Sequence, residues 1–251
     1  MIQQLIVHPL LNDVIDHACV TENESSQIYT VLPSIYTVIG FQFSGEIYHA
    51  EEDRALNILG VTGILDRWRR FRSDAATKSL LIFLKPGGFY RIFGPAVGAL
   101  KSDSLALADV TPTGVRQAFY DILMASGSIS DKWTRLQERF LKLINRDLSP
   151  ESRLALNFLH AENGLCRVAR IAKDLRVSKR TLERKFAAEI GTSPKHLARL
   201  FRWKSTLRNL GKYSDLGTAA LANGYFDQAH FVRETKDLSG TSPKKLKLSG
   251  F

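Results

Sequence analysis

Polar side chains near the C-terminal end of the chain have the types and spacing that read base edges in DNA. Gln228, His230 and Arg233 lie close together in an expected helix, and Phe231 belongs to the apolar face of that helix. Glutamine pairs with adenine and arginine with guanine in the major groove, and Ala229 can touch a thymine methyl group. The segment therefore predicts a base-reading helix.

A short helix and a turn are expected to position these side chains. Leu216 to Asn223 reads as the short helix, and Gly224 with Tyr225 reads as the turn. Asp227 is the expected N-cap of the next helix, because its carboxylate can accept hydrogen bonds from the free amides of the first turn. The segment is therefore predicted to be a helix-turn-helix.

The same plan occurs twice in the chain. In the segment Val168 to Gly191, Ser178 is the expected N-cap, while Leu182 and Phe186 supply the apolar face of the second helix. Each copy closes with Gly-Thr-Ser-Pro-Lys, at residues 191–195 and 240–244, an offset of 49 residues. Internal repetition is stronger evidence than a single motif match, so we interpret this region as a duplicated module.

At these residues the chain resembles the C-terminal DNA-binding domain of AraC/XylS-type transcription regulators, over about Glu151 to Leu248. The resemblance implies two helix-turn-helix units joined by one long helix, whose second helices enter successive major grooves of one DNA site. The base-contact residues that it implies are Arg180, Glu183 and Arg184 in the first copy and Gln228, Ala229, His230 and Arg233 in the second.

One position departs from the family pattern. Thr235 aligns with Phe186, where the family usually has a large apolar anchor. The loss of a buried Phe forfeits roughly 1.5–3 kcal/mol of burial free energy. The second recognition helix is therefore expected to be seated less firmly than the first.

A long helix is expected from Ser193 and Pro194 to about Leu210, and it would fix the distance between the recognition helices. Its Trp203 is expected in the core. Side chains near helix ends position a protein on phosphates without reading sequence. The expected phosphate contacts are Ser178, Lys179, Lys185, Lys195, Arg202 and Lys204.

The positive charge lies in the repeated module. Residues 150–251 carry 20 Lys and Arg against 9 Asp and Glu, so their net charge is +11, and residues 1–149 carry −1 of the total of +10. A basic domain beside a near-neutral one favours nucleic-acid binding. We therefore expect a 1–148 sensor or dimerisation domain and a 149–251 double helix-turn-helix domain.

The first part of the chain reads as β-rich, with short strands typical of a barrel or sandwich that can enclose a ligand. The expected strands are Ile28 to Leu32, Ile35 to Phe43, Ala55 to Val61 and Ser79 to Leu84. In the basic stretch 66–72 we expect Trp68 and Phe71 to face inward. The predicted fold class is α+β, with this barrel-like or sandwich-like domain followed by two helices and then an all-α domain.

Two further segments have open interpretations. Lys85 to Gly94 is similar to a Pro-Gly-Gly and Phe-Gly pattern in the sensor-like domain that precedes such DNA-binding modules. Its Phe89, Tyr90 and Phe93 could line a pocket or a subunit contact, although core packing is the favoured reading. Helical periodicity over 113–145, broken at Gly127, predicts a helix pair that bridges domains, forms a homodimer or packs within its own domain.

Several classes of protein are disfavoured by the sequence. It shows no signal peptide and no membrane-spanning run, so a cytoplasmic protein is expected. Cys19 and Cys166 lack metal-ligand spacing, and neither a metal nor a cofactor is predicted. Double-stranded DNA is the expected partner, and RNA polymerase, a small-molecule effector of unknown identity and a second copy of the chain remain open.

The leading hypothesis is a ligand-responsive, sequence-specific transcription regulator of bacterial type. One alternative is an architectural DNA-binding protein whose front domain makes protein contacts. The other is a DNA-repair enzyme that uses Cys19 as a nucleophile primed by Asp16 and His17. The chain lacks the common hydrolase, metalloprotease, phosphate-loop and dinucleotide motifs, which favours a protein that is not an enzyme.

Overall fold

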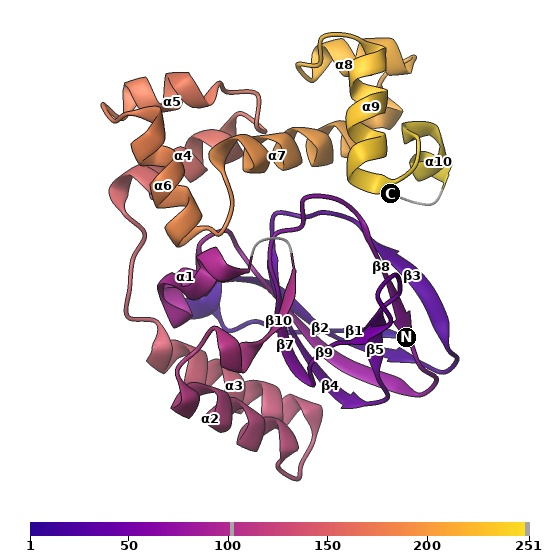
Figure 1. The fold of residues 1–251 in the computed structure, drawn as a ribbon, viewed down its shortest axis with the longest axis vertical. Helices are drawn as coiled ribbons and strands as arrows, with labels where there is room; N and C mark the ends of the chain where they lie inside the picture. Colours follow the sequence, from indigo (N-terminus) through magenta and orange to yellow (C-terminus); the bar gives the residue numbers. More distant parts are fainter. Residues whose placement is uncertain (101–102, 249–251) are drawn as a thin grey trace.

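The first part of the chain forms two antiparallel β-sheets in the computed structural model, which describes residues 1–100 and 103–248 (Figure 1). The larger sheet has the order β1-β2-β9-β4-β7-β10 and the smaller β3-β8-β5-β6. The strands of the larger sheet are Ile2–Leu5 (β1), Ile15–Asn23 (β2), Thr37–Ser44 (β4), Leu59–Thr62 (β7), Thr77–Leu84 (β9) and Ser104–Ala106 (β10). Those of the smaller sheet are Gln27–Val31 (β3), Ile47–His49 (β5), Arg54–Ala55 (β6) and Arg69–Ser73 (β8).

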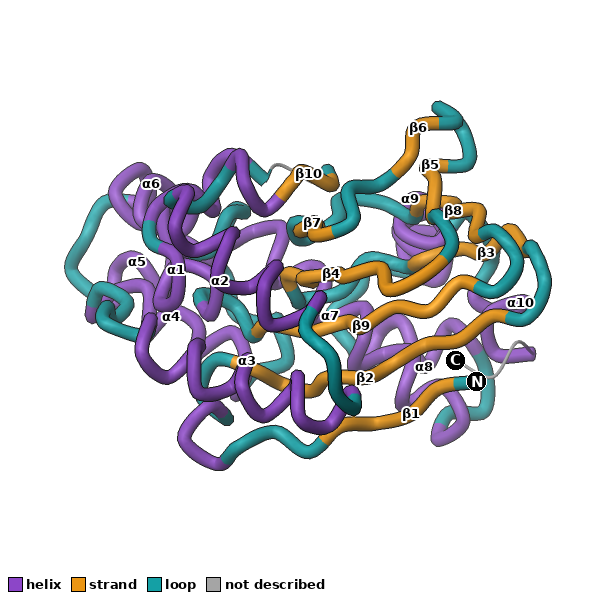
Figure 2. Tube along the Cα trace, turned by 90° about the horizontal axis from the view of Figure 1, so that it is seen from below, coloured by secondary structure: helices purple, strands orange, loops and turns teal. Residues whose placement is uncertain are grey.

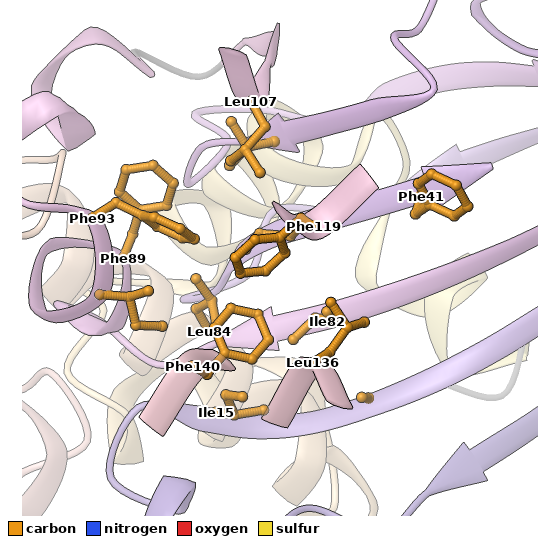
Figure 3. Packing of buried hydrophobic residues seen from close by; sticks show 14 of the residues in the cluster. Ile15, Phe41, Ile82, Leu84, Phe89, Phe93, Leu107, Phe119, Leu136 and Phe140 are labelled. Atoms are coloured by element: carbon orange, nitrogen blue, oxygen red, sulfur yellow. The ribbon is translucent and has the colours of Figure 1, made fainter. Parts of the chain in front are cut away.

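One face of the larger sheet is covered by helices (Figures 1 and 2). Along β9, Leu80, Ile82 and Leu84 are buried at alternate positions, because alternate side chains of a strand point to the same face. The helices that follow this strand are Gly88–Phe93 (α1), Thr113–Met124 (α2) and Ile129–Leu143 (α3), with short 3₁₀ turns at Pro9–Leu11 (η1), Pro95–Ala99 (η2) and Leu107–Asp109 (η3). Sheet and helices share one apolar core, part of which Figure 3 shows.

The helix pair of residues 113–145 belongs to this core. Ser128 begins α3 with a capping box, and Trp133, Leu136 and Phe140 are buried along one face of the helix. The Trp133 indole N–H donates to the carbonyl oxygen of Ile6 at 2.7 Å. Of the three readings of the pair, packing within its own domain is the one that the structure shows.

The stretch Lys85 to Gly94 contains the short helix α1, which begins at the second of two adjacent glycines, Gly88. Phe89 and Phe93 of α1 are buried with ring centroids 4.8 Å apart, so the aromatic cluster packs in the core, as the favoured reading predicted. Gly87 precedes α1 with φ +84°, a conformation that L side chains rarely adopt. A methyl group at this position would lie 2.8 Å from Cδ1 of Leu148, so the glycine also admits the segment that leads to the second domain.

The expected β-rich domain is confirmed, and several strands differ from the predicted ones. The run 55–61 is split into β6 and β7, and β1, β2, β5, β8 and β10 were not predicted. Strand β2 pairs with both β1 and β9, and its sequence mixes Asp, His, Thr and Glu with apolar residues. In β8, Phe71 is buried as expected, and Trp68 just before it is half-buried.

The second half of the chain is helical, as predicted. Its helices are Pro150–Ala161 (α4), Val168–Asp174 (α5), Lys179–Glu189 (α6), Pro194–Asn209 (α7), Leu216–Ala222 (α8), Gln228–Ser239 (α9) and Pro243–Leu248 (α10), with a 3₁₀ turn at Leu210–Lys212 (η4). Ser149 and Ser193 cap α4 and α7, each followed by a proline that favours the first helical position. Each of these helices, α4 to α10, contributes buried residues to a shared apolar cluster, which also contains Ile35 and Ile64 of the sheet domain.

Residues 1–100 and 103–248 contain neither a membrane-spanning helix nor a metal-binding cluster. No helix in that part of the chain is both long and apolar enough to cross a membrane. The same residues contain no group of three or more His, Cys, Asp and Glu side chains that could hold a metal ion.

Removal of a buried ring from α3 tests whether the helix pair is part of the sheet-domain core. We expect Phe140→Ala to lower the free energy of unfolding by about 3–5 kcal/mol, because the cavity left by a buried Phe relaxes only partly. Urea unfolding followed by Trp fluorescence measures the loss. The control Met124→Ala removes a side chain that is 57% exposed and should change the free energy by no more than about 0.5 kcal/mol. Equal losses in both variants would contradict this placement.

Candidate nucleic-acid interface

The first helix-turn-helix consists of α5 and α6. Ser178 caps α6, where its hydroxyl oxygen accepts a hydrogen bond from the Thr181 amide at 3.0 Å. Leu182 and Phe186 are fully buried and seat the helix on the domain. The candidate base-contact residues of this copy lie on the outer side: Arg180 and Arg184 are exposed, and Glu183 is partly exposed and pairs with Lys179 at 3.6 Å.

The second helix-turn-helix consists of α8 and α9. Asp227 caps α9 as predicted, and its carboxylate accepts from the His230 amide at 2.6 Å. Phe231 and Leu238 are fully buried. Gln228, Ala229 and Arg233 are exposed, so three of the four candidate base-contact residues share the outer side of the helix.

His230, the fourth candidate, is held closer to the protein. Its Nδ1 accepts a hydrogen bond from the Phe226 amide at 3.3 Å, and its ring lies edge-on to the Tyr225 ring. Because Nδ1 accepts, the proton of the neutral ring is on Nε2. The side chain keeps 39% of its surface exposed, and its Nε2 atom lies 4.0 Å from Oε2 of the buried Glu234.

Thr235, which aligns with the large apolar anchor Phe186 of the first copy, is itself buried in the helical core. Thr235 is fully buried, and its hydroxyl oxygen accepts a hydrogen bond from the Trp203 indole at 3.3 Å. The position equivalent to Trp203 in the first copy, 49 residues earlier, is Leu154. A large ring on α7 therefore stands beside the small residue on α9, and the looser seating of the second helix stays a prediction.

Equivalent positions of the two recognition helices make ion pairs of opposite polarity. In the first copy, Lys185 of α6 pairs with Glu151 of α4 at 2.7 Å. In the second, the equivalent residue is Glu234 of α9, which pairs with Arg202 at 3.1 Å and Arg199 at 3.2 Å, both on α7. Glu234 is 8% exposed, so its carboxylate depends on these arginines for its charge partners.

The expected phosphate contacts fall into two groups. Ser178, Lys179 and Lys195 are exposed around α6 and at the start of α7. Lys185 and Arg202 are engaged in the ion pairs just described, and their role as phosphate contacts stays a prediction. Lys204 is also engaged within the protein, since its ammonium group lies 3.3 Å from the hydroxyl oxygen of Tyr36 and over its ring.

The surroundings of Cys19 give no support to a thiolate nucleophile. Cys19 is buried, and burial raises the pKa of its thiol, whereas an activated thiolate needs a lowered pKa. His17 hydrogen-bonds Asp16 at 2.8 Å and stacks on Phe83 with ring centroids 4.1 Å apart. The residues that were expected to prime the thiol are thus engaged with other partners.

Comparison with known proteins agrees with this geometry. A family model described as a helix-turn-helix domain matches residues 171–248, which confirms the resemblance of the C-terminal region to AraC/XylS-type regulators. This region is therefore a DNA-binding domain of the kind found in transcription regulators. No curated protein matches the sequence.

Several solved structures match this chain, at low sequence identity and with TM-scores below 0.5. ToxT from Vibrio cholerae is 12% identical, with 98% of each chain covered and a TM-score of 0.46. The C-terminal domain of AraT, a response regulator from Geobacillus stearothermophilus, is 25% identical over 41% of this chain and 88% of that one, with a TM-score of 0.38. The AraC-like transcriptional activator CuxR is 11% identical over 85% of this chain and 86% of that one, with a TM-score of 0.30.

The ion pairs beneath the recognition helices can be tested by truncation at equivalent positions. We expect Glu234→Ala to lower the free energy of unfolding by about 1.5–3 kcal/mol, because it leaves two arginines without a charged hydrogen-bond partner. The matched variant Lys185→Ala breaks a pair whose side chains are 26% and 27% exposed and should cost about 1 kcal/mol or less. Chemical unfolding of both variants measures the difference, and a larger loss in Lys185→Ala would contradict the assignment.

Proposed function

We propose that this protein is a sequence-specific DNA-binding transcription regulator that responds to a ligand. The observation that carries the proposal is the pair of helix-turn-helix copies on one shared core, each with polar side chains exposed on its second helix. The net charge of +11 on residues 150–251 supplies the sequence-independent attraction to the phosphate backbone. A regulator that binds genomic DNA in this way would act in the cytoplasm.

Base recognition is assigned to both recognition helices. In α6, Arg180 and Arg184 have the donors to bind guanine O6 and N7, and Glu183 can accept from cytosine N4. In α9, Gln228 suits adenine, Arg233 suits guanine, Ala229 can touch a thymine methyl group and His230 can donate from Nε2. Ser178, Lys179 and Lys195 remain as the proposed phosphate contacts, since their polar ends are exposed.

The sheet domain, which we place at residues 1–148, is proposed to sense the ligand and residues 149–251 to bind DNA. A cleft of about 610 Å³ lies where the two parts meet, and residues of both parts line it, among them Tyr36 and Lys85 from the first and Phe201, Lys204 and Arg208 from the second. A ligand there would contact both domains. It would therefore favour the domain arrangement to which it binds more tightly.

Five Lys and Arg side chains and three Asp side chains line this cleft, and this excess of cations favours an anionic ligand with an apolar part. Burial and the neighbouring Arg208 both lower the pKa of Lys204, so a bound anion would relieve the crowding of cations. Within the described residues, the side chains of Arg153 and Arg208 make no hydrogen bond or ion pair, and both line the cleft. Ile35 and Phe201 supply apolar surface beside them.

Substitution of one arginine in each recognition helix tests the base contacts. We expect Arg184→Ala and Arg233→Ala each to weaken binding to the preferred DNA site by about 1–3 kcal/mol and to relax preference at a different base position. The preferred site is first recovered from genomic fragments with the full-length protein at about 0.15 M salt. Binding isotherms on that site and on its single-base variants then measure the change.

The exposed Arg135 on α3 provides the control, because Arg135→Ala removes the same charge away from both recognition helices. That variant should keep the base preferences of the wild type. Unchanged preferences in both Arg184→Ala and Arg233→Ala would contradict the assignment, and recovery of DNA without any recurrent site would favour an architectural DNA-binding protein.

The proposed ligand class can be tested by thermal stability. We expect decanoate or benzoate, as carboxylates with an apolar body, to raise the melting temperature by roughly 5 °C or more at about 100 times the dissociation constant. Arg208→Gln should reduce this rise, because it removes a cation of the cleft, whereas Arg135→Gln should not. If neither carboxylate raises the melting temperature, the proposed ligand class is wrong.

A further inference from the structure

The glycines that end the two recognition helices are equivalent residues of the duplication. Gly191 follows α6 and Gly240 ends α9, 49 residues apart in sequence. Both have a positive φ, +82° and +71°, as expected where a helix ends in a left-handed residue. Each glycine is also in contact with the sheet domain.

The end of α6 rests on η2. A methyl group added to Gly191 would lie 2.9 Å from Cγ2 of Val97 and 3.0 Å from its carbonyl oxygen, so the two backbones are in close contact. A methyl group on Gly98 would lie 3.3 Å from the carbonyl oxygen of Ala187 in α6. Val97 is 1% exposed and belongs to the sheet-domain core, so the support beneath α6 is continuous with that core.

The end of α9 rests on Trp68. A methyl group added to Gly240 would lie 2.6 Å from Cε2 and 2.7 Å from Nε1 of the Trp68 indole. Trp68 stands next to β8, whose Phe71 is buried in the sheet domain. Figure 1 shows both recognition helices running toward the sheet domain, with their C-terminal ends nearest to it.

We propose that the sheet domain braces both recognition helices at these equivalent ends and thereby sets their position relative to each other. Val97 and Trp68 are the positioning residues. The inference rests on the proposed DNA-binding function for its consequence, since two helices that read one DNA site must keep a spacing of about one helical turn. The contact of each helix end with the sheet domain does not depend on DNA.

The brace leaves the candidate base-contact residues uncovered. The exposed Arg180 and Arg184 lie before the C-terminal end of α6, and Gln228 and Arg233 lie before that of α9. Helices that enter the major groove contact bases mainly with their N-terminal residues. The sheet domain can therefore hold the helices in position while they bind DNA.

A third contact lies between the two braced ends. The Nε2 atom of His196, near the start of α7, is 3.0 Å from the carbonyl oxygen of Leu65, and burial lowers the pKa of this histidine. The neutral ring then donates from Nε2 to that carbonyl group. The sheet domain thus contacts α6, α7 and α9 in succession, and this restraint lowers the ordering cost of binding a two-part DNA site.

A distance measurement tests the brace without DNA. Spin labels on Lys179→Cys and Gln228→Cys, the equivalent first residues of α6 and α9, report the separation of the two helices in the full-length protein. The native Cys19 and Cys166 are buried, which favours labelling at the introduced sites. We expect one narrow distance distribution, a broader one when Trp68→Ala is added, and a narrow one again with Trp68→Phe. An unchanged distribution in Trp68→Ala overturns the brace.

The effect on DNA binding is measured by footprinting each half of the preferred site separately. Trp68→Ala should weaken protection of the half bound by α9 by at least about five-fold and leave the other half unchanged. Gly98→Ala, which pushes on the end of α6, should weaken the other half, and Ile58→Ala at an exposed position of the sheet domain should affect neither. Equal weakening of both halves, or tighter binding, in Trp68→Ala overturns the brace; absence of any preferred site in the wild type overturns the proposed function instead.

Discussion

Helix α7 packs against both helix-turn-helix copies at once, and the placement of both recognition helices depends on this double packing. Leu197, Leu200 and Trp203 are buried because apolar residues recur along α7 at intervals of three or four. Its N-terminal proline and Ser193 cap place its start directly after α6. A rigid helix with a continuous apolar face turns two small modules, neither of which buries much surface alone, into one core.

The ion pairs of opposite polarity favour the packing of α6 on α4 and of α9 on α7. Lys185 meets a glutamate on α4, whereas Glu234 meets two arginines on α7. If α6 were seated on α7, Lys185 would approach Arg199 and Arg202, and like charges in a partly buried site repel strongly. The duplicated sequence therefore carries, at one position of each copy, a charge that disfavours exchange of the recognition helices.

The parts of the structure that follow from local sequence could be predicted, and those that depend on distant partners could not. Helix caps such as Asp227 and the repeated closing pentapeptide lie within a few residues of what they specify. By contrast, the sequence alone does not show that Arg202 has a charge partner, because the partner, Glu234, lies 32 residues away. Strand β2 was not predicted for a related reason. Its mixed polar sequence lacks a strand pattern, and the strand is stabilised by its pairing with β9, which is distant in sequence.

The cleft between the domains is larger than the pocket inside the sheet domain. The pocket among β4, β7 and β9 measures about 70 Å³, whereas the cleft between the domains measures about 610 Å³. A ligand bound in the cleft, as proposed above, would adjoin Tyr36 and Lys204, whose contact joins the sheet domain to α7. If the ligand bound one domain arrangement more tightly than another, it would act on α7 directly. Because α7 packs against both recognition helices, the effect would reach them without a pathway through the sheet core.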